Sequence, residues 1–369
     1  MNKMNKIESL QNFMVETEIP LVAVTAGPDL RYLTGLDFHV SERPAILLLA
    51  AHGQPHLVHP ELEALKVKGC KFPLVSFPYG ESKDTWATVC TQALNAQPGN
   101  KTKIGVISTQ MRYLEMELLH KAGPKLHFVS VDDCFQKMRM HKEVGEISSI
   151  RKAVEIAERA FLATIRFIEP GRTEKEIAST LVMNLLRSGS DPELPFSPIV
   201  ASGPNSADPH AIPTERMVEV GDLIVIDWGA ACNHYISDIT RTISVGSPVA
   251  DFNQIAKIVI AANTAAREKA DEKVLCSDVD AAARAVITSA GYGDYFTHRT
   301  GHGIGMEAHE APYISAEYQY PLEIGNTFTI EPGIYLPGRG GVRIEDNVVI
   351  TEHGAETLTS LSRDLFIVD

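Results

Sequence analysis

Short apolar runs alternate with amphipathic segments in the first part of the chain. Four apolar runs have the length of a strand: residues 21–25, 45–50, 103–107 and 127–131. Three segments between them have a helical pattern: residues 60–68, 82–94 and 111–121. Strands and helices that alternate in this way predict an α/β domain, and this part of the chain carries no obvious catalytic cluster.

The pattern changes near residues 137–143, where a much longer helical segment begins. Its apolar residues recur at the spacing of one helical face: Ile147, Ile150, Val154, Ala157 and Phe161. A Pro-Gly pair at 170–171 ends this segment, and Thr173 with Glu176 has capping-box spacing for a helix through residue 186. We therefore predict a smaller accessory α/β domain in residues 1–138 and a second domain in residues 139–369.

The second domain contains two predicted strand pairs separated by helices. The paired segments are residues 222–231 with 236–245, and residues 326–336 with 341–350. The helices between the pairs are predicted at residues 252–269 and 278–290. This order predicts an α+β domain in which two similar halves close around a shared sheet.

Composition narrows the set of partners. The chain has 47 acidic and 34 basic residues, a formal net charge of −13, and no run rich in Lys and Arg. We therefore expect neither nucleic acid nor a membrane as a partner. The five cysteines include no C-x-x-C pair, and the N-terminal segment lacks the apolar stretch of a signal peptide. Both features favour a cytoplasmic protein with reduced thiols.

Two aspartates lie on the first predicted strand pair. Asp227 follows the apolar run 223–226, where an ionised carboxylate is costly unless it is paired or binds a metal. An ordinary turn aspartate is the alternative. Asp238 shares a strand face with Thr240 and Thr242, which alone would indicate only a solvated face. A hairpin of this length can bring the two carboxylates together, and their repulsion then calls for a cation.

A histidine and two glutamates follow later in the chain. His302 lies in the glycine-rich string GHGIG at residues 301–305. A dinucleotide-binding loop is excluded because Met306 occupies the place of the third glycine. Glu331 and Glu345 lie on the polar faces of the second strand pair. If the polar faces of both pairs meet, four carboxylates and one imidazole converge.

Such a convergence predicts a site for two divalent metal ions. Two cations would neutralise the four carboxylates, polarise a carbonyl group and make a water nucleophilic near neutral pH. Oxygen-rich ligation with one imidazole favours manganese, and cobalt, iron or zinc also fit.

The residues of this set lie in strings that resemble the pita-bread metallopeptidases, which include methionine aminopeptidase, aminopeptidase P and prolidase. The matching strings are IDWG at 226–229, SDITRT at 237–242, TGHGIG at 300–305, IEPG at 330–333 and VRIED at 342–346. The resemblance implies a pita-bread (creatinase/aminopeptidase) fold for residues 139–369 and a creatinase-N-like fold for residues 1–138. Methionine aminopeptidases lack the accessory domain and are therefore the poorer match.

The resemblance implies a role for each of the five ligands. Asp227 would bind the first metal, while Asp238 and Glu345 would bridge both. His302 and Glu331 would complete the second metal site. Glu331 is also implied as the general base that moves a proton from the attacking water to the leaving nitrogen.

Three histidines outside the ligand set also match positions in the family. His210, at the end of the string SGPNSADPH, is implied near the substrate, where it would stabilise an oxyanion. His309 matches the family's second substrate-side histidine. His39 stands where some relatives reach into a partner subunit's site, and an ordinary surface-loop histidine is the alternative.

One departure from the family bears on the substrate. Many prolidases carry an arginine shortly after the His-Glu pair, where it binds the C-terminal carboxylate of the dipeptide, and Tyr313 stands there instead. A tyrosine hydroxyl donates one hydrogen bond and cannot form a bidentate pair. Arg343 shares a strand face with Glu345, so it is expected to bind a substrate carboxylate or to orient a metal ligand, and a structural ion pair with a neighbouring acid is the alternative.

The resemblance implies hydrolysis of the bond between an N-terminal residue and proline, in dipeptides or short peptides. Xaa-Pro dipeptidase is the first expectation, and Xaa-Pro aminopeptidase on longer peptides is the second. A metal-free creatinase-like hydrolase and a non-catalytic binding module are further alternatives, but the complete set of five ligands argues against both. The resemblance also suggests a homodimer.

Overall fold

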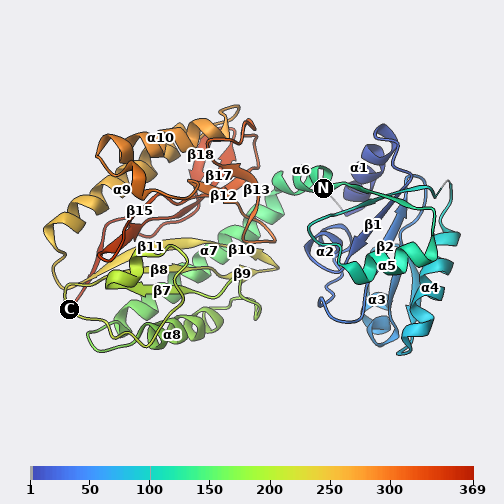
Figure 1. Ribbon diagram of the computed structural model, residues 1–369, viewed down its shortest axis with the longest axis horizontal. Coiled ribbons are helices and arrows are strands. Elements are labelled where there is room, and N and C mark those ends of the chain that lie inside the picture. Colours follow the sequence, from blue (N-terminus) through green and yellow to red (C-terminus); the bar gives the residue numbers. More distant parts are fainter. Residues whose placement is uncertain (1–2, 100) are drawn as a thin grey trace. The chain divides into compact units, whose positions relative to one another are not determined.

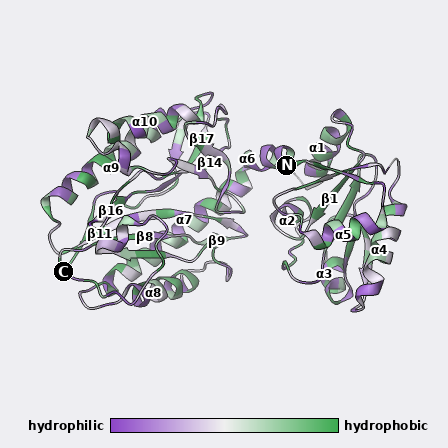
Figure 2. Cartoon of the chain, viewed as in Figure 1, coloured by the Kyte–Doolittle hydropathy of each residue, from purple (hydrophilic) through white to green (hydrophobic). Residues whose placement is uncertain are grey.

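The chain divides between Met138 and Arg139 into two units, each with its own hydrophobic packing (Figure 1). The structure is a computed structural model, and it describes residues 3–99 and 101–369. Hydrophobic residues line most of the strands of both units (Figure 2). None of the helices in these described residues combines the length and the apolar content that a bilayer crossing requires.

The N-terminal unit is built on one six-stranded sheet of mixed direction, with strand order β4-β3-β2-β1-β5-β6. Its strands are β1 (Leu21–Thr25), β2 (Ile46–Ala50), β3 (His56–Pro60), β4 (Val75–Tyr79), β5 (Lys103–Val106) and β6 (His127–Ser130). The central pairs β1–β2 and β2–β3 are antiparallel, and the outer pairs are parallel. The expected α/β organisation is therefore present, with β3 and β4 added to the four predicted strands.

Short helices accompany this sheet. They are α1 (Lys3–Glu16), α2 (Pro28–Thr34), α3 (Ala64–Lys68), α4 (Lys83–Ala96), α5 (Tyr113–Ala122) and α6 (Asp132–Met140), with a 3₁₀ turn at Glu61–Glu63. The apolar sides of α4 and α5 pack on the sheet through Trp86, Leu94 and Leu119. The prediction of one helix over 60–68 was wrong at its start, because Pro60 is still part of β3 and pairs with Tyr79.

The first half of the second unit packs two helices on a four-stranded sheet. Helices α7 (Val144–Thr164) and α8 (Glu174–Arg187) share one core with a sheet of order β19-β11-β8-β7. Phe161 of α7 stacks on Trp228 of β8, with ring centroids 4.5 Å apart. The predicted capping box is confirmed, since Thr173 and Glu176 exchange side-chain-to-backbone hydrogen bonds at the start of α8.

The second half repeats this arrangement later in the chain. Helices α9 (Ala250–Lys269) and α10 (Cys276–Ser289) share a core with a five-stranded sheet of order β13-β12-β14-β17-β18. In Figure 1, α9 and α10 lie along the upper edge of this unit and α8 along its lower edge, with strands between them. The expectation of two similar halves is in this respect correct.

The strands of the second unit are mostly short. In chain order they are β7 (Ile199–Ser202), β8 (Leu223–Trp228), β9 (Ala231–Cys232), β10 (Tyr235–Ile236), β11 (Ile239–Val245), β12 (Gly301–Gly303), β13 (Glu310–Ile314), β14 (Thr327–Ile330), β15 (Gly333–Leu336), β16 (Gly340–Arg343), β17 (Asp346–Thr351), β18 (Gly354–Thr357) and β19 (Phe366–Val368). Three 3₁₀ turns complete the unit, at Ile165–Phe167, Gly203–Ala207 and Gly293–Tyr295.

The prediction of long strands in the second pair, closing on one shared sheet, was wrong. The segment 326–336 breaks into β14 and β15, and the segment 341–350 breaks into β16 and β17. β14 pairs with β17 in the five-stranded sheet, whereas β15 pairs with β16 in a separate ribbon. The breaks fall at Glu331-Pro332 and Ile344-Glu345, so both glutamates lie where the chain passes between the five-stranded sheet and the ribbon.

Arg241 ties the two halves of the second unit together. Its side chain is fully buried and pairs with the equally buried Asp346 at 2.9 Å. The same guanidinium donates hydrogen bonds to four backbone carbonyls, those of Thr240, Glu345, Leu361 and Ser362. It therefore joins β11 of one sheet to the segment that leads into β17 of the other.

We predict that Arg241→Gln lowers the free energy of unfolding by about 3 kcal/mol, because it leaves buried carbonyls without a donor and weakens a buried ion pair. The expected loss lies at the lower end of the range for broken buried ion pairs, because Arg363 still contacts Asp346 at 2.6 Å. Urea unfolding measures the change. The matched control is Arg339→Gln, which breaks the exposed pair with Asp251 and should cost less than about 0.5 kcal/mol. Equal effects of the two substitutions would contradict this assignment.

Candidate metal centre

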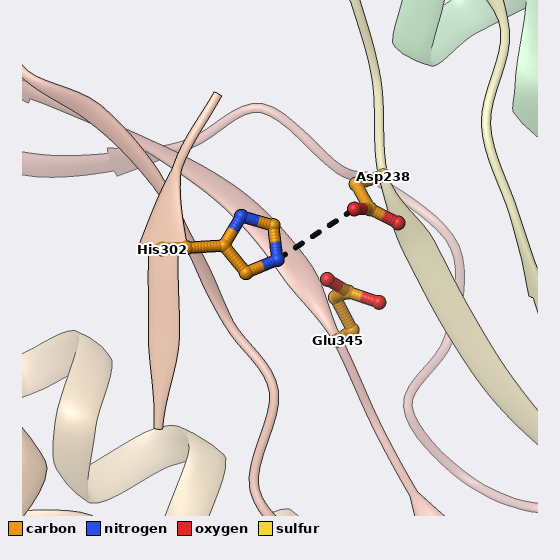
Figure 3. Close-up of side chains that lie close together, drawn as sticks. All are labelled: Asp238, His302 and Glu345. Atoms are coloured by element: carbon orange, nitrogen blue, oxygen red, sulfur yellow. Dashed lines mark ion pairs between the residues drawn. The ribbon is translucent and has the colours of Figure 1, made fainter. Parts of the chain in front are cut away.

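Three predicted ligands from separate segments converge in the second unit. Asp238 immediately precedes β11, His302 lies in β12, and Glu345 lies between β16 and β17. One ligand atom of each lies within 4.8 Å of the ligand atoms of the other two, and all three residues are buried. Figure 3 shows the imidazole and both carboxylates pointing toward one another.

Asp227 and Glu331 complete the group. Glu331 Oε1 lies 3.3 Å from His302 Nε2, and Asp238 Oδ2 lies 3.7 Å from the same nitrogen. Asp227 lies on β8 directly opposite Thr240 of β11. All five predicted metal-ligating residues line one cavity of about 620 Å³. The convergence expected from the sequence is therefore present in the second unit.

Hydrogen bonds hold the Glu345 carboxylate and the backbone that carries Asp238. Thr240 Oγ1 donates to Glu345 Oε2 at 2.7 Å, and the Glu345 amide donates to the Thr240 carbonyl at 3.1 Å. Asn347 Oδ1 accepts a hydrogen bond from the Asp238 amide at 3.1 Å. These bonds cross from one sheet to the other, so the same contacts that join the sheets also orient the ligands.

His302 is oriented with Nε2 toward the carboxylates. Its Nδ1 lies 3.2 Å from the Gly303 carbonyl, which assigns the ring proton to Nδ1 and leaves the Nε2 lone pair available. Glycine is required on both sides, because a Cβ at Gly301 would collide with the Thr329 carbonyl and one at Gly303 with the Ala311 carbonyl. The crowding expected from the GHGIG string is thus a close approach of three backbone segments.

The electrostatics of the group favour neutral forms in the absence of a cation. Burial raises the pKa of Asp238 and of Glu345 well above the ordinary carboxyl value, and the neighbouring carboxylates add to the rise. Burial is also the main reason that the pKa of Glu331 rises to about 8. Burial lowers the pKa of His302 well below its ordinary value, and the nearby His309 adds to the fall. The imidazole is therefore neutral, as a metal ligand must be.

These features fit a divalent metal site. The buried Oδ1 of Asp227 has no hydrogen-bond partner among the described residues, although an unpaired buried carboxylate oxygen is costly. Positive charge placed among the carboxylates removes that cost and returns their pKa values toward the ionised range. An oxygen-rich set with one imidazole suits manganese, cobalt, iron or zinc.

Arg343 is engaged by the protein itself. Its guanidinium pairs with Asp227 Oδ2 at 2.7 Å and also donates to Thr240 Oγ1, the Pro209 carbonyl and the Tyr335 hydroxyl. Of the roles expected for Arg343, the contacts support an ion pair that orients Asp227, a predicted metal ligand, rather than binding of a substrate carboxylate. Tyr335 OH also lies 2.8 Å from His298 Nε2, and the sequence prediction included neither residue.

The rest of the cavity wall is part polar and part apolar. His210 and His309 line it, and the His309 ring meets the His302 ring edge to face with centroids 4.3 Å apart. Burial lowers the pKa of His309, and the positive charge of Arg299 lowers it further. The apolar part consists of Phe196, Ile199, Pro209 and Ala308. Of these lining residues the sequence prediction contained only the two histidines.

Two predicted substrate residues lie outside the cavity lining. Tyr313 is on β13, and the guanidinium carbon of Arg299 lies 4.8 Å above the centre of its ring. Arg299 lines the cavity, so Tyr313 contacts a lining residue without lining the cavity itself. His39 lies on an exposed loop of the N-terminal unit. Arg299 and His298 directly precede the TGHGIG string, and this proximity was the signal by which the sequence could have identified them.

A buried glutamate fixes the loop that carries His210. Glu174, in the first turn of α8, accepts hydrogen bonds from the amides and hydroxyls of Ser202 and Thr214 and from the Asn205 side chain. Burial alone would raise the pKa of Glu174, but these hydrogen bonds outweigh it and the pKa is lowered. From the sequence, Glu174 looks like any acidic residue at a helix N-terminus, so its role could not be predicted.

Comparison with known proteins finds a family match for each unit of the chain. Residues 148–352 match the metallopeptidase family M24, and residues 6–141 match the creatinase/prolidase N-terminal domain. The chain is 37% identical to the Xaa-Pro dipeptidase of Pyrococcus furiosus, covering 98% of this chain and 99% of that one.

Two solved structures are similar over their full length. A dipeptidase from Pyrococcus horikoshii OT3 has a TM-score of 0.92 at 37% identity, covering 99% of this chain and 100% of that chain. An X-Pro aminopeptidase from Thermotoga maritima MSB8 has a TM-score of 0.86 at 34% identity, covering 98% and 99%.

The raised pKa of Glu331 predicts how the stability of the metal-free protein depends on pH. A carboxyl whose pKa rises from 4.5 to about 8 on folding stabilises the fold below the lower value, and this contribution is lost as the pH rises through the higher one. In urea unfolding, the wild type should therefore lose stability relative to Glu331→Gln as the pH rises from 5 to 9. Added manganese should reverse the loss.

The matched control is Glu352→Gln, which removes an exposed carboxyl in the turn after β17, outside the cavity lining. It should keep the wild-type dependence on pH. If stability curves of the wild type and Glu331→Gln run parallel over this range, the raised pKa and the mutual repulsion of the carboxylates are refuted.

Proposed function

The chain belongs to the metallopeptidase family M24, and on that premise we propose that it is an Xaa-Pro dipeptidase, which hydrolyses the bond between an N-terminal residue and a C-terminal proline. The matches confirm the expected pita-bread fold for the second domain and the creatinase-type fold for the first. The substrate is inferred from the relatives named Xaa-Pro dipeptidase, of which the Pyrococcus furiosus protein is one.

The observation that carries the proposal is one cavity with two chemically different parts. One part holds the five metal-ligating residues, and the other is walled by Phe196, Ile199, Pro209 and Ala308. Proline has a rigid apolar ring and no amide hydrogen, so a site for it needs apolar surface rather than an acceptor for an N–H group. An acidic group of ligands beside an apolar wall is suited to an Xaa-Pro bond.

We propose that two divalent cations, with manganese as the first choice, are held by Asp227, Asp238, His302, Glu331 and Glu345. When bound, such a pair polarises the scissile carbonyl and makes a water nucleophilic near neutral pH. The family is metal-dependent, and the chemistry of the donors is the support for manganese. Arg343 holds the Asp227 carboxylate in place through its 2.7 Å ion pair.

The protein side chains handle the proton and the developing charge. Glu331 accepts a proton from the attacking water and delivers it to the proline nitrogen. The water oxygen forms a bond to the carbonyl carbon, the bond from that carbon to nitrogen breaks, and the products are a free amino acid and proline. His210 and His309, both on the cavity wall, donate hydrogen bonds to the carbonyl oxygen as negative charge develops there.

A second candidate is an Xaa-Pro aminopeptidase that acts on longer peptides. It is favoured by the absence of a charge at Tyr313 and by the likeness to the X-Pro aminopeptidase of Thermotoga maritima. A metal-free hydrolase and a binding module stay disfavoured, because all five ligands line one cavity.

We also propose a homodimer in which the exposed His39 serves the partner's site.

The test is peptide hydrolysis by the full chain, stripped of metal and then supplied with manganese. We expect cleavage of Ala-Pro only after manganese is added, and no cleavage of the tripeptide Gly-Pro-Ala. Asp238→Asn should abolish cleavage, because it removes a charge from the centre of the ligand group. The matched control, Asp251→Asn, removes an exposed carboxylate and should leave the rate unchanged. Proline release measured by chromatography gives the rates.

Each other outcome identifies a different error. Cleavage of the tripeptide alone would move the assignment to an aminopeptidase. If neither peptide is cleaved after manganese is restored, proline specificity is wrong even though the fold stands.

A further inference from the structure

Arg299 is the charged residue of the cavity wall that the catalytic account leaves unused. It lines the cavity beside His298, and its guanidinium makes no hydrogen bond or ion pair with any residue in 3–99 and 101–369. Arg343, the other arginine of the lining, donates hydrogen bonds to the side chains of Asp227, Thr240 and Tyr335 and to a backbone carbonyl. Arg299 therefore has its donors available for a ligand.

Tyr313 holds this guanidinium without using any of those donors. The guanidinium carbon lies 4.8 Å from the centre of the Tyr313 ring, which is the arrangement of a cation–π contact. The Tyr313 ring in turn meets the Tyr318 ring edge to face at 5.6 Å. Because a cation–π contact acts on the face of the guanidinium, its N–H groups at the edge keep their full capacity to bind an anion.

The charge of Arg299 acts inside the cavity. Arg299 lines the same cavity as His302, His309 and Glu331. A positive charge on this wall is available to a substrate that binds in the cavity.

A dipeptide that ends in proline brings a carboxylate into this cavity. The carboxylate is attached to the proline ring, one carbon away from the scissile nitrogen, so it enters wherever the ring enters. Burying a carboxylate without a partner is costly, and a guanidinium is its best-matched partner because it forms two parallel hydrogen bonds. A longer peptide has a neutral amide at the same place and gains less from the charge.

We propose that Arg299 binds the C-terminal carboxylate of the dipeptide and that Tyr313 positions Arg299 for this contact. This inference rests on the proposed dipeptidase function and names the residue that gives it selectivity for dipeptides. Tyr313 thus supports a charge that comes from the loop before β12, instead of supplying one.

The experiment compares Ala-Pro with Ala-Pro-amide, which lacks only the negative charge, using the manganese-loaded enzyme. Arg299→Gln should raise KM for Ala-Pro by about 10- to 100-fold, the size expected for a lost charge-assisted hydrogen-bond pair. It should change KM for the amide and kcat for either substrate by less than about threefold. The matched control is Arg187→Gln, which removes the same charge from an exposed position on α8 and should change nothing.

Two substitutions of Tyr313 distinguish the role of its ring from that of its hydroxyl. Tyr313→Leu removes the ring, so it should raise KM for Ala-Pro several-fold and leave the amide unaffected. Tyr313→Phe keeps the ring and should match the wild type. If Tyr313→Phe has the same defect as Tyr313→Leu, the hydroxyl acts directly, and the proposed role of the ring in positioning Arg299 is wrong.

Binding without turnover tests the same contact independently of catalysis. In calorimetry with the metal-stripped full chain, the wild type should bind Ala-Pro more tightly than Ala-Pro-amide, and Arg299→Gln should abolish that preference. If the wild type cleaves neither peptide but keeps the preference, the proposed function fails and the carboxylate contact stands. An unchanged preference in Arg299→Gln would overturn the proposal.

Discussion

Four carboxylates that line one buried cavity are the constraint on which this structure depends. Burial and the charge of neighbouring carboxylates favour the protonated forms of Asp238, Glu331 and Glu345, so these three cannot all be ionised beside Asp227 unless positive charge lies among them. Arg343 offsets only part of this charge, through its pair with Asp227. The orphaned oxygen of Asp227 points to the same need. A metal centre therefore explains why the fold holds so many acids together.

The fold meets this constraint by making the ligands part of the junction between its sheets. The hydrogen bonds that cross from one sheet to the other involve Thr240 and Asn347, which also orient Glu345 and Asp238. At the same junction the fully buried guanidinium of Arg241 pairs with Asp346. Any movement of one half against the other would therefore displace the ligands. We infer that stability and metal affinity are coupled in this unit, since metal binding to the folded state adds to its stability.

The sequence predicted the proposed ligands but not their geometry. Asp227, His302 and Glu331 could be identified because each sits in a short string of specific spacing. The breaks at Pro332 and before Glu345 could not be predicted, because local patterns continue across them and tertiary packing decides where each ladder ends. Spacing also could not show which arginine of the cavity keeps its donors available. Arg343 shares a face with Glu345 and pairs with Asp227, whereas the Arg299 guanidinium, in the loop before β12, makes no hydrogen bond or ion pair with the residues that the structure describes.

The central claim is that the five ligands hold two divalent cations, and crystallography of the manganese-loaded protein tests it most directly. Data collected at the manganese absorption edge reveal each ion as a separate anomalous peak. The account predicts two peaks, with the carboxylates of Asp238 and Glu345 in contact with both. A single peak, or ions bound away from these five side chains, would contradict it.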